Sequence, residues 1–327
     1  MRVVVIGATG HIGSYLVPRL VRAGHEVVAI SRGSRQPYRG DPAWGQVRTV
    51  SADRDAGDAD GSFAPMVAGY EADAVMDLMC FTPESAAALV DALRDRCGHL
   101  LHCGTIWVHG HLTQVPATED APRHPFGDYG IGKAAIERLL LSETATGGLA
   151  CTVLHAGHIS GPGWWVVNPA GNLDSAVWER LATGREVLLP DAGLTTLHHV
   201  HADDVASAFV AALHRRSTAA GESFHVVSPA ALTMRGFAEA AAGWFGREAV
   251  LSFAPWREFA ERVGAENARL SWDHLAHSPS ASTAKAAALL GWTPRFSSLQ
   301  ATFQAVRWQL DAGQLPIGSS RMADPGL

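Results

Sequence analysis

The stretch Val-Val-Val-Ile-Gly-Ala-Thr-Gly-His-Ile-Gly, from Val3 to Gly13, decides the fold of this chain. A short β-branched run stops at a glycine, two more glycines follow at intervals of three, and apolar residues then recur at helical spacing. A strand, a glycine turn and a helix in this order form the pyrophosphate site of dinucleotide-binding α/β proteins, where the glycines allow a tight turn and close approach of the backbone. We therefore expect cofactor contacts from Gly7, Thr9, Gly10, His11, Ile12 and Gly13.

The composition is that of a globular protein without an electrostatic case for nucleic-acid binding. The 327 residues suggest about two domains, 47% of them are hydrophobic, and the net charge of −6 comes without a basic stretch. No apolar run approaches the ~20 residues that span a bilayer, and the N-terminus lacks the features of a signal peptide. Free thiols in a reducing compartment are expected because no paired spacing links Cys80, Cys97, Cys103 and Cys151. The sequence thus predicts a soluble cytoplasmic protein without a membrane partner.

Short apolar runs alternate with helical segments along the first half of the chain. Strands are predicted at residues 25–31, 46–51, 74–79, 99–103 and 151–155. This alternation predicts an α/β fold with a doubly wound parallel sheet of the Rossmann type. We assign residues 1–158 to the dinucleotide-binding domain, with 196–228 returning to it, and residues 159–195 and 229–327 to a smaller, mostly helical substrate lobe. The last ten or so residues are expected to form a loose tail.

The end of the second predicted strand indicates which dinucleotide is bound. It reads Ser31-Arg32-Gly33-Ser34-Arg35, and no acid occurs from Val27 through Gly40. A carboxylate there would bind the ribose of NAD, whereas arginine and serine donors suit the 2′-phosphate of NADP. We therefore favour NADP(H) over NAD(H), with contacts from Ser31, Arg32 and Arg35; the alternative is that both arginines are solvated loop charges. Past the third strand, Asp53 and Arg54 can reach the adenine, or Asp53 belongs to a simple turn.

Tyr129 and Lys133 are the candidates for chemistry. A spacing of four places them on one face of a predicted helix, and an ammonium near a phenol lowers its pKa from ~10 and eases proton transfer. The competing interpretation is a helix with a surface lysine and a packing tyrosine. Thr105 follows the fifth strand, so its hydroxyl is expected at the ligand-binding edge of the sheet.

These motifs together resemble the extended short-chain dehydrogenase/reductase superfamily, and within it the NAD-dependent epimerase/dehydratase branch. The resemblance runs from residue 1 to about 310 and rests on Gly7-Gly10-Gly13, Thr105, Tyr129/Lys133, Gly161-Pro162-Gly163 and Leu290–Pro294. It implies that Tyr129 is the general acid/base, that Lys133 holds the nicotinamide ribose and lowers the pKa of Tyr129, and that Thr105 binds the same substrate oxygen.

The resemblance also suggests neighbours for the cofactor and the substrate. It places Met79 and His155 beside the cofactor, and it assigns the substrate to Cys80, Thr105, Trp107, His158, Trp164 and Trp165. Three positions depart from the family pattern: Thr105 replaces a frequent serine, His109 a tyrosine, and His155-Ala156 an Arg-Pro pair. The last departure weakens a nucleotide-sugar assignment.

Aromatic residues and histidines gather after the Gly-Pro-Gly turn. Trp164 and Trp165 follow it directly, and on an extended segment only one of them can face the pocket, which favours an apolar or aromatic substrate. His158 is the candidate for a polar substrate contact, and a structural loop histidine is an equal alternative. For His198, His199 and His201 a structural role is favoured, and no metal site is predicted.

Three functions fit these observations. The first is an NADP(H)-dependent oxidoreductase that moves a hydride between nicotinamide and a ketone or alcohol, with Tyr129 moving the proton. The second is an epimerase or dehydratase that acts on a sugar-type substrate with a tightly held NAD(P). The third is a non-catalytic dinucleotide sensor, which the pairing of Tyr129 with Lys133 disfavours. The expected partners are a small-molecule substrate and a second copy of the chain, because proteins of this fold commonly form homodimers.

Overall fold

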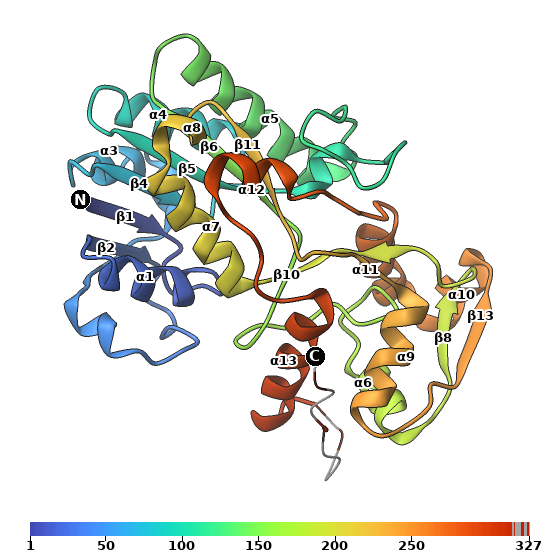
Figure 1. The fold of residues 1–327 in the computed structure, drawn as a ribbon. Helices are drawn as coiled ribbons and strands as arrows, with labels where there is room; N and C mark the ends of the chain where they lie inside the picture. The colour runs from blue at the N-terminus through green and yellow to red at the C-terminus, as the bar shows by residue number, and fades with distance from the viewer. Residues whose placement is uncertain (316, 318–321, 324–325, 327) are drawn as a thin grey trace.

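The fold is organised around a seven-stranded parallel sheet; the computed structural model describes residues 1–315, 317, 322–323 and 326 (Figure 1). The strand order is β11-β6-β5-β4-β1-β2-β3, and every neighbouring pair is parallel. The strands are β1 (Arg2–Ile6), β2 (Glu26–Ser31), β3 (Arg48–Ser51), β4 (Ala74–Asp77), β5 (His99–Thr105), β6 (Cys151–Ala156) and β11 (Ser223–Val226). The predicted doubly wound sheet is confirmed. The third strand begins later than expected because η1 (Pro42–Gln46) is a 3-10 helix.

Helices cover both faces of this sheet. On one face α1 (Gly13–Arg22) and α7 (Ala202–His214) share a core with alternate residues of β1, and the intervening residues of β1 face the other side. The helices of that other side are α3 (Phe63–Ala68), α4 (Pro83–Leu93) and α5 (Gly127–Ala145). The short helices α2 (Arg54–Ala59) and η2 (Ile106–His109) follow β3 and β5 directly. Every strand of the sheet therefore ends in a loop or helix start at one common edge.

The chain leaves the sheet after β6 and returns to it once. Directly after β6, β7 (His158–Ser160) pairs with β10 (His199–His201) beside the main sheet. Helices α7 and α8 (Arg216–Ala219) follow, and β11 then joins the sheet next to β6. Helix α12 (Ala284–Leu290) also packs back onto the core of the sheet. The pair β7/β10 thus brings the intervening segment against the edge where β5 and β6 end.

The smaller lobe has a hydrophobic core of its own, which includes Trp178, Phe237, Trp244 and Phe259. Its helices are α6 (Ser175–Thr183), α9 (Met234–Trp244), α10 (Trp256–Val263), α11 (Ala265–Leu275) and α13 (Ser298–Asp311). Its strands form the pairs β8 (Val187–Pro190) with β13 (Leu251–Ala254) and β9 (Thr196–Leu197) with β12 (Leu232–Thr233). The expected loose tail falls mostly outside the described residues.

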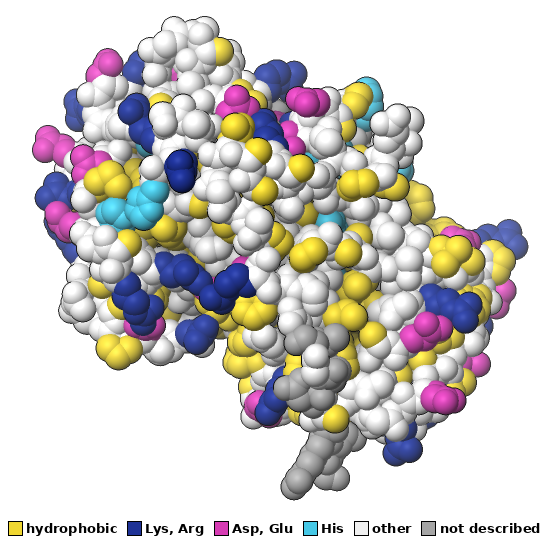
Figure 2. All heavy atoms as spheres, in the orientation of Figure 1, with side chains coloured by type: hydrophobic (Ala, Val, Ile, Leu, Met, Phe, Trp, Pro, Cys, Tyr) yellow, Lys and Arg dark blue, Asp and Glu magenta, His cyan; other side chains and the backbone are white. Residues whose placement is uncertain are grey.

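The surface carries charges of both signs. In Figure 2, side chains of Lys and Arg and of Asp and Glu occur over the sheet domain and over the lobe. The four cysteines are free thiols, as predicted. Among the described residues, no helix has the length and hydropathy needed to cross a bilayer.

Candidate active site

A cavity of about 680 Å³ opens at the carboxyl edge of the sheet, over the glycine turn. This is the point at which the strand order reverses, between β1 and β4, and such switch points are where doubly wound sheets bind ligands. The predicted site residues that line it are Gly7, Thr9, Gly10, His11, Ile12, Gly13, Ser31, Arg32, Arg35, Asp53, Arg54, Met79, Thr105, Trp107, Tyr129, Lys133, His158, Trp164 and Trp165. Two predicted residues, Cys80 and His155, do not line it.

The glycine turn is shaped as a cradle that side chains would fill. Gly7 has φ +85°, and a Cβ added to it would collide with the side chain of Met79. A Cβ on Gly13 would collide with the backbone of Ala8. The amide of Gly10 donates to the carbonyl of Gly7 at 3.0 Å and closes the turn. The backbone therefore meets the requirements of a pyrophosphate site at the start of α1.

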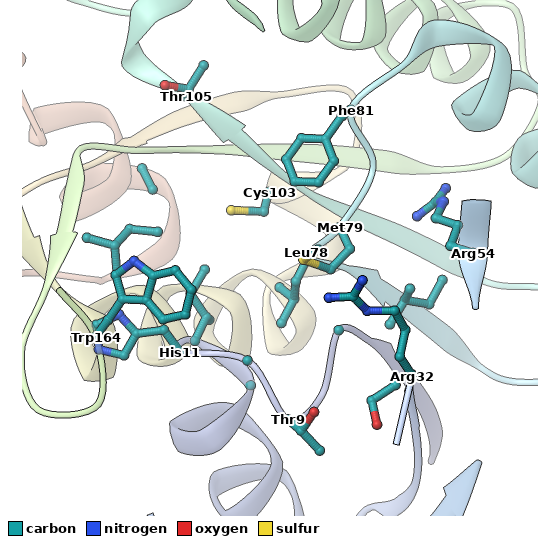
Figure 3. Close-up of a pocket in the computed structure, with 18 of the residues that line it drawn as sticks. Thr9, His11, Arg32, Arg54, Leu78, Met79, Phe81, Cys103, Thr105 and Trp164 are labelled. Atoms are coloured by element: carbon teal, nitrogen blue, oxygen red, sulfur yellow. The ribbon is translucent and has the colours of Figure 1, made fainter. Parts of the chain in front are cut away.

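One end of the cavity carries the arginines and is called the β2–β3 end. It is lined by Ser31, Arg32, Arg35, Asp53 and Arg54, and Figure 3 shows Arg32 and Arg54 on the same side of the cavity. Arg54 is held in place by the buried carboxylate of Asp77, with N–O distances of 2.7 and 2.9 Å. The carboxylate of Asp53 accepts from the amide of Ala56 at 3.1 Å and caps α2, so it serves the local turn while it borders the cavity.

The opposite end is called the β5–β6 end and carries Thr105, Trp107, Tyr129, His158 and the two tryptophans after the Gly-Pro-Gly turn. Figure 3 shows Thr105 and Trp164 across the cavity from Arg32. The ring of Tyr129 meets Trp107 edge to face, with 5.6 Å between ring centres, and is 43% exposed. The hydroxyl of Thr105 accepts from the amide of Trp107 at 3.3 Å, which fixes its side chain at the strand end.

The pKa of Tyr129 moves opposite to the prediction. Although Tyr129 is partly exposed to the cavity, burial by the protein around it raises its pKa above the usual value; Cys103 adds to the rise and the hydroxyl of Thr105 counteracts it only in part. Lys133 does not reverse this balance, because its ammonium lies 5.9 Å from the ring centre and points elsewhere. The expectation that Lys133 lowers the pKa of Tyr129 is therefore wrong for this structure.

The ammonium of Lys133 is buried beneath the cavity and turned toward the sheet. It donates to the carbonyls of Cys80 and Cys103 at 2.8 and 2.7 Å and lies 3.5 Å from Nε2 of His102. Burial lowers the pKa of Lys133. The expected ribose contact of Lys133 would require it to release one of these three partners.

His155 does not reach the cavity, which corrects its assignment to the cofactor. It is fully buried behind Thr105, whose backbone N–H donates to Nδ1 of His155 at 3.1 Å. Because Nδ1 accepts, Nε2 carries the hydrogen, and it donates to Glu137 at 2.9 Å. Glu137 also binds the guanidinium of Arg123, with N–O distances of 3.0 and 2.6 Å. Burial acts to raise the pKa of Glu137, but His155 and Arg123 hold it well below its usual value.

Glu137 was not among the predicted site residues, although its spacing in the sequence gives a signal. Tyr129, Lys133 and Glu137 follow one another at intervals of four, so all three lie along one face of α5. Through His155, Glu137 ties this helix to the backbone at Thr105. Buried hydrogen bonds thereby join the helix that carries Tyr129 to the backbone of Thr105.

Cys80 is likewise corrected as a substrate contact. Its side chain is buried away from the cavity and its thiol donates to the carbonyl of Thr82 at 3.4 Å. Burial raises the pKa of Cys80 to about 12, so the group is an unreactive thiol at neutral pH. Its contribution to the site is the backbone carbonyl that binds Lys133.

Both tryptophans after the Gly-Pro-Gly turn line the cavity, whereas only one of them was predicted to face it. Trp164 lies in a bend directly after the turn, so this segment is not a regular strand and the alternation of side chains does not apply. Trp164 stacks against His11 with ring centres 6.3 Å apart. His274, from α11 of the lobe, also lines the cavity and was missed, because nothing in the local sequence connects it to residues more than a hundred positions away.

The histidines near β10 have structural partners. Nε2 of His198 contacts the carbonyl of Ser228 at 2.8 Å, and Nδ1 of His199 contacts the hydroxyl of Ser160 at 2.8 Å. Nδ1 of His201 accepts from the amide of Asp203 at 3.0 Å and caps α7. In the part of the chain that the structure describes, no three His, Cys, Asp or Glu side chains are grouped so that they could hold a metal ion.

Comparison with known proteins agrees with this architecture. The model of the NAD dependent epimerase/dehydratase family matches residues 3–226. The chain belongs to this family. It is accordingly an NAD(P)-dependent enzyme of the extended short-chain dehydrogenase/reductase type, as the motifs predicted.

Curated relatives carry several activities in their names. The 2'-dehydrokanamycin reductase of Streptomyces kanamyceticus is 29% identical over 80% of this chain, and the match spans 66% of that relative's length. A UDP-glucose 4-epimerase of Corynebacterium glutamicum is 26% identical over 92% of this chain and 93% of its own length. The chloroplast stem-loop binding protein of 41 kDa b from Arabidopsis thaliana is 25% identical over 96% of this chain and 80% of its own.

Solved structures share the whole fold. A UDP-glucose 4-epimerase from Thermotoga maritima with UDP-glucose has a TM-score of 0.72 at 20% identity, covering 95% of this chain and 99% of that chain. A dTDP-glucose 4,6-dehydratase from Bacillus anthracis in complex with NAD has a TM-score of 0.72 at 15% identity, covering 95% and 97%. At this identity the likeness establishes the fold.

Proposed function

We propose that the enzyme is an NADP(H)-dependent oxidoreductase that reduces a ketone or aldehyde, or oxidises the corresponding alcohol. The observation that carries the proposal is the arrangement of one cavity, with Arg32 and Arg35 at one end and Tyr129 beside Thr105 at the other. NADP(H), when bound, supplies or accepts the hydride. Tyr129 donates the proton to the substrate oxygen, and the Thr105 hydroxyl donates a hydrogen bond to the same oxygen.

Reduction of a carbonyl uses the protonated form of Tyr129. Its raised pKa keeps the phenol protonated at neutral pH, which is the form that can donate to a developing alkoxide. Oxidation of an alcohol would need the phenolate, which burial disfavours. A named reductase among the curated relatives is consistent with this direction.

The preference for NADP(H) rests on the β2–β3 end. Arg32, Arg35 and the hydroxyl of Ser31 lie at the tip of β2, and the sequence has no acid from Val27 through Gly40. A second hollow of about 440 Å³ adjoins the cavity through Ser31 and Arg35 and adds Arg39. The hollow is also lined by Asp41, whose carboxylate pairs with Arg22, and its arginines Arg35 and Arg39 are suited to a 2′-phosphate.

The substrate is proposed to have an apolar or aromatic face. Three tryptophan side chains, Trp107, Trp164 and Trp165, border the β5–β6 end and offer broad rings for packing. The homodimer expected from the fold remains a prediction, and sedimentation of the purified chain measures it.

The test is a spectrophotometric assay of the purified chain with NADPH or NADH and a panel of ketones and aldehydes. Carbonyl-dependent oxidation of NADPH with a lower KM than for NADH is expected. A clear preference for NADH would show that Arg32 and Arg35 do not recognise the cofactor.

An epimerase or dehydratase is the second candidate, favoured by the names of several relatives and of solved structures with the same fold. For that function we expect a stoichiometric dinucleotide in the purified protein and no net absorbance change with added cofactor. Intact cofactor binding without turnover of any carbonyl would favour the sensor hypothesis instead.

A further inference from the structure

The β5–β6 end of the cavity presents neutral hydrogen-bond acceptors. Among the described residues that line this end, Lys133 is the one cation, and its ammonium already contacts Cys80, Cys103 and His102. The arginines that line the cavity all lie at the β2–β3 end. A phosphate on the substrate would therefore find no free cation beside Tyr129.

His274 is the clearest of these acceptors. Its Nδ1 lies 2.9 Å from the carbonyl of Gly171 and 2.7 Å from that of Leu270, so Nδ1 must carry the hydrogen. Its Nε2 keeps a lone pair and has no hydrogen-bond partner among the described residues. Burial lowers the pKa of His274, so the ring is neutral at neutral pH. It lines the cavity next to Trp107, with 5.6 Å between the ring centres.

His158 repeats this arrangement beside it. Its Nδ1 lies 3.3 Å from the carbonyl of His198, and its Nε2 is without a partner in the described part of the chain. Burial holds the pKa of His158 well below its usual value. The rings of His158 and His274 have their centres 5.4 Å apart. The lone pair on Nε2 of His274 would face the oxygens of a diphosphate without a shared hydrogen, whereas hydroxyl and amino groups can donate to it. Nε2 of His158 is itself buried, so this contact falls to His274.

We propose that this end binds an unphosphorylated ring with several hydroxyl or amino groups, and that Nε2 of His274 accepts a hydrogen bond from one of them. The apolar face of such a ring would pack on Trp107 and on the tryptophans after the Gly-Pro-Gly turn. The inference rests on the proposed reductase function and names its substrate class. A nucleotide-diphosphate sugar is the substrate class that it excludes.

The first experiment measures binding to the full chain loaded with NADPH, through the fluorescence of the cavity tryptophans. The probes are kanamycin, a hydroxyl- and amino-bearing ring compound without phosphate, and UDP-glucose. We expect saturable quenching by kanamycin and no displacement of it by an equal concentration of UDP-glucose. Spermidine controls for attraction of a cation to the net charge of −6. Displacement by UDP-glucose or by spermidine, or absence of saturable kanamycin binding, would overturn the proposal.

The second experiment assigns the contact to His274. In His274→Phe the ring against Trp107 is kept and the acceptor is lost, so kanamycin should bind about tenfold more weakly. His277→Phe is the matched control, because His277 also stacks on Trp107, at 4.3 Å, and bonds a backbone carbonyl four residues back, yet does not line the cavity. His274→Gln keeps an acceptor and should recover part of the affinity. Equal losses in His274→Phe and His277→Phe would contradict the assignment.

Failure of this inference and failure of the proposed function give different results. If NADPH is oxidised by simple ketones through Tyr129 while kanamycin does not bind, the reductase proposal stands and the substrate class is wrong. If kanamycin binds through His274 and no carbonyl is reduced, the substrate class stands and the reaction is wrong.

Discussion

The two ends of the cavity recognise their ligands by opposite chemistry. The β2–β3 end offers guanidinium groups, which stay charged at any accessible pH and suit phosphate. The β5–β6 end offers tryptophan rings, neutral imidazoles and a protonated phenol. The cofactor is thus expected to bind through permanent charge, and the substrate through shape and neutral hydrogen bonds.

The two ends also differ in how the chain builds them. Residues 31–54 supply the β2–β3 end from two consecutive strands. The β5–β6 end collects side chains from η2, α5, β7 and α11, so it forms only when the lobe packs against the sheet. Substitutions or pH changes that act on one end alone therefore test whether the two ends function independently.

Acidification should affect the β5–β6 end and the strands behind it most strongly. Burial lowers the pKa of His198 to about 4, of His199 to about 3 and of His277 to about 4, from 6.5. Because the unfolded chain binds these protons first, stability is complete above pH 6.5 and falls as the pH drops toward 4, by on the order of 3 kcal/mol for each such histidine. Thermal unfolding between pH 8 and 4 should show a steadily falling Tm.

Two variants check the origin of this acid sensitivity. His199→Leu removes one buried protonation site and should make the decline of Tm with pH shallower. His214→Gln changes an exposed histidine and should leave the slope as it is. A Tm that stays constant from pH 6.5 to 4 would contradict the neutral state of the buried imidazoles.

Tyr129→Phe should remove activity without disturbing the arginine end. The variant lacks the donor for the substrate oxygen, so kcat should fall by about 10² to 10⁴. The Kd for NADPH, measured by fluorescence titration, should stay within about twofold because Tyr129 packs on Trp107 at the β5–β6 end, away from Arg32 and Arg35. Retention of wild-type kcat would rule out Tyr129 as the proton donor.

The sequence was sufficient for features that depend on neighbours along the chain. The glycine turn, the tip of β2 and the Tyr129/Lys133 spacing each lie within a single element or loop, and their positions at the sheet edge follow from the parallel topology. The direction of the Tyr129 pKa shift could not be predicted in this way. It depends on the burial of Tyr129, on its electrostatic interaction with Cys103 and on where the ammonium of Lys133 points.

Features formed by two segments that are distant in the sequence could not be predicted. His155 lies near the end of β6, inside the cofactor domain, but its ring turns behind Thr105 because Glu137 and the Thr105 amide both bind it there. His274 enters the cavity only through the packing of α11. Spacing along the chain carries no information about such contacts, with the exception of Glu137, which shares the four-residue interval of α5.

Removing the charge at the β2–β3 end should give the reverse pattern to Tyr129→Phe. In the double variant Arg32→Ala, Arg35→Ala, the KM for NADPH should rise by about 10² while the KM for NADH and kcat change little, since each lost arginine contact to a phosphate is worth on the order of 1–2 kcal/mol. Arg48→Ala, at the edge strand outside the cavity, is the control. If the KM values for NADPH and NADH rose equally, the arginines would not bind the 2′-phosphate.

The smallest effect is expected at Glu137, which touches neither ligand. Glu137→Gln removes the charge that His155 and Arg123 share, while the buried amide can still accept from His155. The free energy of unfolding should fall by about 1–3 kcal/mol. Because the Thr105 amide depends on His155, kcat should fall by about tenfold with the Kd for NADPH unchanged.

A purely structural role for Glu137 would lower stability and leave kcat per folded molecule unaltered. Glu239→Gln provides the matched comparison, since Glu239 pairs with Arg235 on the lobe surface and its ion pair is exposed. Glu239→Gln should change the free energy of unfolding by no more than about 0.5 kcal/mol. It should leave kcat unchanged. If Glu137→Gln lowers kcat only in proportion to the folded fraction, the link from α5 through His155 to Thr105 stabilises the fold without positioning the hydroxyl. If kcat falls further than the folded fraction, the β5–β6 end depends on a buried charge that lies outside its own cavity.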